Sequence, residues 1–97
     1  MSRRLASGIA LICLACATSG PEPDWQIYAN TIAKETPSQS DLERCDVLKD
    51  TTLAGDCTLT IATRLSRQGD VPLQTYCPQV SSGVWQEECY FVAAERA

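Results

Sequence analysis

Four cysteines beyond residue 40 of this 97-residue chain are regularly spaced. Cys45 and Cys57 are twelve positions apart, and so are Cys77 and Cys89. Each cysteine of the second pair lies 32 residues after its counterpart in the first pair. The neighbours that recur in the same register are Leu53 and Trp85, Asp56 and Glu88, Leu59 and Phe91, Ala62 and Ala94, and Arg64 and Arg96. We interpret this set as an internal duplication.

The residues around the cysteines indicate helices. Apolar side chains recur every fourth residue at positions 53, 57, 61 and 65, which is the spacing of one helix face. Threonines alternate with apolar residues over 57–61, which would also suit a strand. We favour a helix, because the matching segment 87–96 is rich in Glu, Ala and Arg, which are good helix formers. The sequence therefore predicts an all-α fold.

Two further helices are expected upstream. Asp24 is a candidate N-cap for a helix that ends before Pro37, and Ser40 is a candidate N-cap for a helix in which Glu43 completes a capping box. Pro72 and Pro78 bracket a segment in which we expect at most a short helix over 72–77, followed by a turn through 81–83.

One helical domain over residues 24–97 is therefore expected, with repeat units of about 38–69 and 70–97. The second unit stops inside its last helix, so we expect it to be truncated and to expose apolar surface. The period of the repeat resembles, loosely, that of tetratricopeptide-like helical hairpins. Over roughly residues 40–97 the chain also resembles disulfide-stabilised helical repeats of exported bacterial proteins.

The N-terminus has the three parts of an export signal. Arg3 and Arg4 are followed by an uncharged stretch over residues 5–15 and then by small residues. The stretch is too short to cross a bilayer, which needs about 20 residues. We interpret residues 1–15 as a signal peptide and residues 16–23, with Pro21 and Pro23, as a tether that resists helix formation.

Two cleavage sites compete at the end of this signal. Residues 13–16 resemble the lipobox of bacterial lipoproteins, in which Cys16 would carry diacylglycerol and palmitate and anchor the chain in the cell envelope. Cys13 departs from that pattern, which usually has Leu three residues before the cysteine. In a Gram-negative host, Ala17 after the lipidated cysteine would suggest the outer membrane. The alternative is ordinary cleavage after Ala17, which gives a secreted or periplasmic protein.

Export would oxidise the remaining cysteines, which then act as disulfides in a domain too small for a large core. Four cysteines allow three pairings. The repeat favours the local pairs Cys45–Cys57 and Cys77–Cys89. The runner-up is the nested pairing of Cys45 with Cys89 and Cys57 with Cys77. Cysteines twelve positions apart lie about 120° apart on one helix, and Gly55 and Gly83 should interrupt long helices, so the nested pairing is disfavoured.

No arrangement of residues predicts catalysis. The chain has no histidine, the commonest general base and metal ligand, and the long gaps between cysteines do not suit a zinc site. Apart from Arg3 and Arg4, the chain has six basic and twelve acidic residues. This excess of negative charge disfavours nucleic-acid binding. We therefore expect no enzyme activity, cofactor, metal or small-molecule ligand.

The six aromatic residues, Trp25, Tyr28, Tyr76, Trp85, Tyr90 and Phe91, are expected in the core rather than in a binding groove. The sequence predicts a lipid-anchored envelope protein with a small helical domain that binds an unidentified protein partner. The alternative is a freely secreted, disulfide-stabilised inhibitor or effector.

Overall fold

A computed structural model describes residues 22–96 of the chain. The predicted signal peptide and Cys16, the predicted site of lipid attachment, lie outside these residues. Six elements follow one another: α2 (Asp24–Ile32), α3 (Gln39–Asp46), α4 (Thr51–Gly69), the 3₁₀ turns η1 (Leu73–Thr75) and η2 (Cys77–Gln79), and α5 (Gly83–Arg96). The described part is all-helical, as predicted, and the strand alternative over 57–61 is wrong because these residues lie in the middle of α4.

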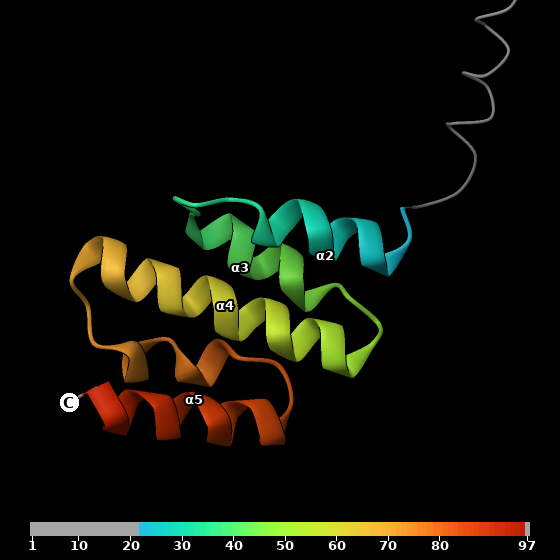
Figure 1. The fold of residues 1–97 in the computed structure, drawn as a ribbon. Helices are drawn as coiled ribbons and strands as arrows, with labels where there is room; N and C mark the ends of the chain where they lie inside the picture. The colour runs from blue at the N-terminus through green and yellow to red at the C-terminus, as the bar shows by residue number, and fades with distance from the viewer. Residues whose placement is uncertain (1–21, 97) are drawn as a thin grey trace, which may run out of the picture.

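The chain runs back and forth through a stack of helices (Figure 1). The helices α2, α4 and α5 run in one direction, while α3 and the two 3₁₀ turns return in the other. Helix α4 lies at the centre of the stack, with α2 and α3 on one side and η1, η2 and α5 on the other. Helix α5 therefore forms one edge of the molecule.

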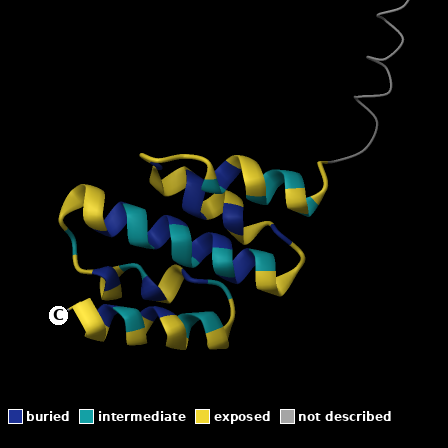
Figure 2. Cartoon of the chain, viewed as in Figure 1, coloured by how far each residue is buried: buried dark blue, intermediate teal, exposed yellow. Residues whose placement is uncertain are grey.

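The core follows α4 along its length (Figure 2). Helix α4 buries eight of its residues, among them Cys57 and Ile61, which are completely inaccessible. The predicted apolar stripe therefore does face the core. Leu42 from α3 and Val80 after η2 close the core from its two sides.

The two halves of the stack follow the repeat seen in the sequence. Helix α4 begins at Thr51 and α5 begins at Gly83, which is the same offset as between the cysteine pairs. A disulfide joins α3 to α4 through Cys45 and Cys57, and another joins η2 to α5 through Cys77 and Cys89. The segment that corresponds to α3 forms only two 3₁₀ turns, because prolines at 72 and 78 cannot donate the backbone bonds of an α-helix.

Three local predictions were wrong. Pro23, not Asp24, is the N-cap of α2, and the Asp24 carboxylate instead accepts hydrogen bonds from the backbone N–H groups of Lys49 and Asp50, 2.9 and 2.8 Å away. Helix α3 starts two residues earlier than expected, with a capping box made by Ser38 and Asp41 rather than by residues 40 and 43. Gly55 does not interrupt a helix, since α4 runs through it.

Within residues 22–96, none of the helices combines the length and apolar character required to cross a membrane.

Candidate functional site

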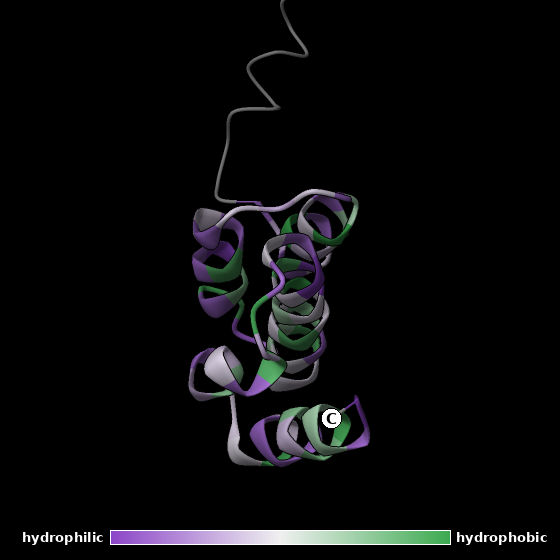
Figure 3. Ribbon diagram, turned by 90° about the vertical axis from the view of Figure 1, so that its left-hand side faces the viewer, coloured by the Kyte–Doolittle hydropathy of each residue, from purple (hydrophilic) through white to green (hydrophobic). Residues whose placement is uncertain are grey.

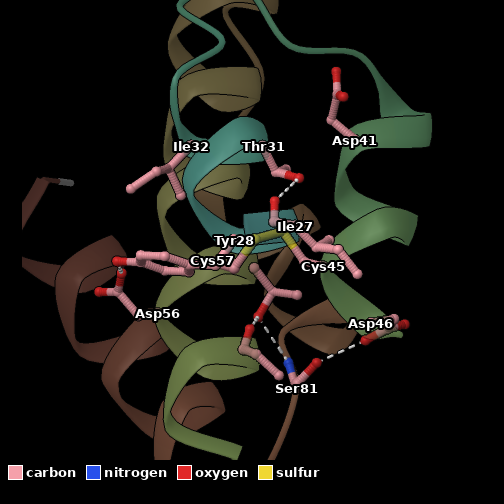
Figure 4. Close-up of a disulfide and its surroundings, with 12 residues drawn as sticks. Ile27, Tyr28, Thr31, Ile32, Asp41, Cys45, Asp46, Asp56, Cys57 and Ser81 are labelled. Carbon is pink, nitrogen blue, oxygen red and sulfur yellow. Dashed lines mark hydrogen bonds between the residues drawn. A yellow bond between two sulfur atoms is a disulfide. The ribbon is translucent and has the colours of Figure 1, made fainter. Parts of the chain in front are cut away.

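The four cysteines of the described chain are structural. Each is completely buried, and the pairs are Cys45 with Cys57 and Cys77 with Cys89, which is the local pairing. Each bridge ties a short return segment to the long helix that follows it. In Figure 4 the first bridge lies between α3 and α4 beneath Ile27 and Thr31 of α2. Oxidised and inaccessible sulfur atoms offer neither a nucleophile nor a metal ligand.

A hydrogen bond between Tyr28 and Asp56 joins α2 to α4. The Tyr28 hydroxyl on α2 donates a hydrogen bond to the Asp56 carboxylate on α4 (Figure 4). This bond, together with burial and the nearby negative charge, raises the pKa of Tyr28 to about 12. Tyr28 therefore stays protonated beyond the pH at which an ordinary tyrosine ionises, and its hydrogen bond holds α2 against α4.

A second polar contact holds the C-terminal end of α2. The Arg64 guanidinium on α4 donates hydrogen bonds to the backbone carbonyls of Ile32 and Lys34, the latter at 2.9 Å. These carbonyls lie at the C-terminal end of α2, where a cation is favourable. Arg64 and Asp56 are therefore both engaged in holding α2 in place.

Asp41 is buried at the start of α3. Its carboxylate accepts a hydrogen bond of 2.8 Å from the Ser38 backbone N–H and lies 3.1 Å from the Lys34 ammonium. The bond from Ser38 is the main reason why the pKa of Asp41 is lowered from 3.8; burial opposes this shift, and Lys34 adds to it. The group is a charged helix cap rather than a general acid.

One side of α5 is held firmly against the rest of the fold. The Trp85 indole lies directly on Gly55 of α4, where an added Cβ would be 2.0 Å from the ring. Cys89 and Ala93 are buried on the same side. The Gln86 side-chain amide donates hydrogen bonds of 3.2 and 3.0 Å to the carbonyls of Pro78 and Val80.

The opposite side of α5 is exposed and partly apolar, and we call it the α5 outer face. The side chains that form it are Val84, Glu87, Glu88, Tyr90, Phe91, Ala94 and Glu95. Val84 is 74% exposed, Phe91 61% and Tyr90 47%. At about 100° per residue these positions make one continuous strip along the helix. Hydrophobic colouring on α5 at the edge of the stack is visible in Figure 3.

Three carboxylates, those of Glu87, Glu88 and Glu95, are spread along this strip. A shallow hollow of about 340 Å³ lies beside it, lined by Gln74, Tyr90, Ala93 and Ala94. The strip therefore combines negative charge with exposed aromatic area, and aromatic residues are enriched at protein–protein interfaces.

Two other surface features are weaker candidates for a binding site. Trp25 of α2 and Val47 after α3 are also exposed, in the half of the stack that lies across α4 from α5. A hollow of about 470 Å³ at the end of α4 contains Arg67, Asp70 and Arg96 in an open, mixed-charge setting. No group of three or more potential metal ligands comes together among residues 22–96.

The expectation that the aromatic residues are core is wrong for half of them. Tyr28, Tyr76 and Trp85 pack against the core, while Trp25, Tyr90 and Phe91 are exposed. Periodicity could not separate these groups, because exposure of Tyr90 depends on what covers α5. The contact between Trp85 and Gly55 was also missed, although a glycine within an apolar helix pattern is a signal of close approach.

The chain was compared with protein-family models, curated proteins and solved structures, and none of the three comparisons gave a match.

Proposed function

We propose that this chain is an exported, non-catalytic protein-binding module that is anchored in the cell envelope by lipid on Cys16. The observation that carries the proposal is the α5 outer face, on which Val84, Tyr90 and Phe91 remain exposed on a helix fixed by a disulfide. Large exposed aromatic side chains on a rigid element are the residues that dominate protein–protein interfaces.

The polar groups of the domain support a binding role rather than catalysis. Asp41 caps a helix, Asp56 accepts a hydrogen bond from Tyr28, and Arg64 binds backbone carbonyls. The exposed glutamates of the α5 outer face have no neighbouring base or nucleophile in their strip. Their arrangement suits recognition of a charged partner.

Two disulfides fit an exported protein, because they persist in oxidising compartments. The lipobox-like residues before Cys16 support anchoring by lipid, and two or more acyl chains are sufficient for stable membrane attachment. The helical domain starts at Asp24, so a segment of only a few residues would separate it from the lipid.

The anchor is tested by the intact mass of the protein from membrane and soluble fractions of a lipoprotein-processing bacterial host. We expect lipid mass on Cys16 in the membrane fraction, and Cys16→Ser should move the protein to the soluble fraction. A mature N-terminus at Thr18 without lipid would instead show the freely secreted alternative.

The binding role is tested by site-specific photo-crosslinking in the envelope. A benzophenone amino acid at Phe91 should give discrete protein adducts in intact cells. The matched control carries it at Trp25, an exposed aromatic residue in the half of the stack across α4 from α5, and should not give those adducts. Absence of adducts from position 91, or the same adducts from both positions, would contradict a binding role for α5.

A further inference from the structure

We propose that the α5 outer face binds a basic helix of another protein, which lies on α5 in the way that the second half of the stack lies on α4. This inference rests on the proposed binding role of α5 and adds the chemistry and placement of the partner.

The first step is the surface of α4 that receives the second half. Gly55, Thr58 and Ala62 lie three and four positions apart, on one side of the helix. The Trp85 ring lies on Gly55, and the Ser81 backbone N–H donates a hydrogen bond of 3.0 Å to the Thr58 hydroxyl oxygen. Thr58 and Ala62 are both completely buried. This side of α4 is therefore a contact surface for the unit that follows.

The second step is the orientation of α5. Cys57 of α4 and its repeat counterpart Cys89 of α5 both point inward to a disulfide and are completely buried. Ile61 and Ala93, one turn later, are buried as well. The two helices also run in the same direction (Figure 1). Residues that correspond in the repeat therefore occupy the same sides of α4 and α5.

The third step follows from this correspondence. Glu87, Tyr90 and Ala94 occupy on α5 the positions that Gly55, Thr58 and Ala62 occupy on α4.

These positions differ sharply in exposure. Thr58 is inaccessible, whereas its counterpart Tyr90 is 47% exposed; Ala62 is inaccessible, whereas Ala94 is exposed. The second half of the stack, which packs on α4, also contacts the return segment α3. There the Ser81 hydroxyl donates a hydrogen bond of 2.6 Å to the Asp46 carboxylate. The hollow between Gln74 of η1 and Tyr90 is the corresponding place beside α5.

The negative charge of the α5 outer face indicates which kind of partner can bind there. Glu87, Glu88 and Glu95 are exposed along the face, and residues 22–96 contain six basic and twelve acidic residues. A second copy of this chain would bring three more carboxylates to the interface, and an anionic lipid surface would also be repelled. A helix with Lys or Arg beside apolar residues would pair with the glutamates, cover Phe91 with its apolar side chains, and place a cation on the Tyr90 ring.

The probe is a synthetic amphipathic helix of leucine and lysine, titrated into the disulfide-bonded domain and followed by backbone amide NMR shifts and calorimetry. Shifts should be confined to η1 and α5, and affinity should fall as salt is raised. Tyr90→Ala with Phe91→Ala should weaken binding by about tenfold or more, as expected for interface aromatics. Glu87→Gln with Glu88→Gln should weaken it and reduce the salt dependence. Trp25→Ala is the matched control and should bind as the wild type does.

Several outcomes would overturn the inference. They are equal binding of a leucine–glutamate peptide of the same pattern, shifts centred on Trp25, and insensitivity to the glutamate substitutions. Dimerisation in sedimentation that Phe91→Ala abolishes would identify a second copy as the occupant. Binding to phosphatidylcholine vesicles that depends on Phe91, without peptide binding, would identify a membrane. If the peptide fails while crosslinking from position 91 succeeds, only the partner's chemistry is wrong; if both fail, the binding role fails as well.

Discussion

At the scale of single residues, Gly55 is the position that most constrains the stack. Alanine in the middle of a helix is ordinarily favoured over glycine by about 0.5–1 kcal/mol. At Gly55, however, a new Cβ would lie 2.0–2.4 Å from atoms of the Trp85 ring, so the ring or the whole of α5 would have to move. The absence of a side chain is what allows α4 and α5 to approach each other.

We expect Gly55→Ala to destabilise the protein by about 1–3 kcal/mol, the usual cost of overpacking a well-packed contact. Gly69→Ala is the matched control, because its Cβ would meet only Val71 at 3.4 Å, an ordinary contact. Urea unfolding followed by circular dichroism measures both variants. Equal stability of the two variants would show that Trp85 does not lie on Gly55.

Tyr28 should make stability depend on alkaline pH. Its pKa is raised from 10.0 to about 12 in the folded protein, chiefly by the hydrogen bond to Asp56. The folded state therefore holds this proton more tightly than the unfolded chain, so the stabilisation is complete below pH 10 and is lost as pH rises through 12. Tyr28→Phe should be less stable at neutral pH and should lose part of the decline at alkaline pH.

This expectation is checked by ultraviolet titration of tyrosinate and by unfolding experiments at several alkaline pH values. Asp56→Asn should bring the Tyr28 titration back toward its ordinary range, since the carboxylate is the main source of the shift, with burial adding to it. Tyr76→Phe is a control that removes a tyrosine without this hydrogen bond. A Tyr28 pKa near the ordinary 10.0 in the wild type would contradict the contact.

At the scale of elements, the start of α3 depends on one carboxylate. Asp41 accepts the Ser38 backbone N–H, and its side chain is only 5% exposed. We expect Asp41→Ala, which removes the acceptor, to cost about 1 kcal/mol, typical for loss of a helix cap. Lys34 contributes little to this, because its side chain is 54% exposed.

The lowered pKa of Asp41 also determines how the stability of the protein changes in acid. Because the folded-state pKa lies below the ordinary 3.8, the stabilisation is present above that value and is lost as pH falls through the folded-state pKa. Asp41→Asn should therefore flatten the loss of stability in acid. Glu43→Gln, an exposed change on the same helix, is the control and should keep the acid dependence. Unfolding by urea over a series of acidic pH values compares them.

The elements also show what can be predicted from sequence and what cannot. The helix over 51–69 and the local cysteine pairing follow from periodicity and from the repeated cysteine spacing, since both are set by residues near one another in the chain. The capping box was placed two residues late because Ser40 and Glu43 fit the pattern as well as Ser38 and Asp41. In the folded domain Asp41 is buried and Glu43 is exposed, and burial is decided by the whole stack. Exposure of Tyr90 and Phe91 depends in the same way on tertiary packing.

At the scale of the whole molecule, the two halves of the stack are unequal. Both disulfides have a sequence separation of 12, so each restricts the unfolded chain to the same extent, by about 3 kcal/mol in the chain-entropy model. The structures that they hold differ. Helix α4 buries eight residues and contacts every other helix, whereas α5 buries only Cys89 and Ala93.

Removing each bridge should therefore have a different consequence. In Cys77→Ala with Cys89→Ala, we expect α5 to detach while residues 22–69 stay folded, because few buried contacts remain to hold that helix. In Cys45→Ala with Cys57→Ala, α3 and α4 lose the bridge at the centre of the core, and the domain should unfold as a whole at lower denaturant. Amide hydrogen exchange separates the two cases. Rapid exchange confined to α5 is expected in the first variant and exchange throughout the stack in the second.

The opposite result for the first variant would show that α5 does not depend on its disulfide. If α5 remains protected without its disulfide, the contact between Trp85 and Gly55 must hold the helix unaided. The disulfide is then dispensable for presenting the α5 outer face, and binding through Tyr90 and Phe91 should survive in the variant that lacks it. If α5 detaches, the Cys77→Ala with Cys89→Ala variant should lose binding while α2, α3 and α4 stay protected from exchange. The same variant therefore tests whether the bridge at Cys89 is what keeps the α5 outer face in a form that a partner helix can recognise.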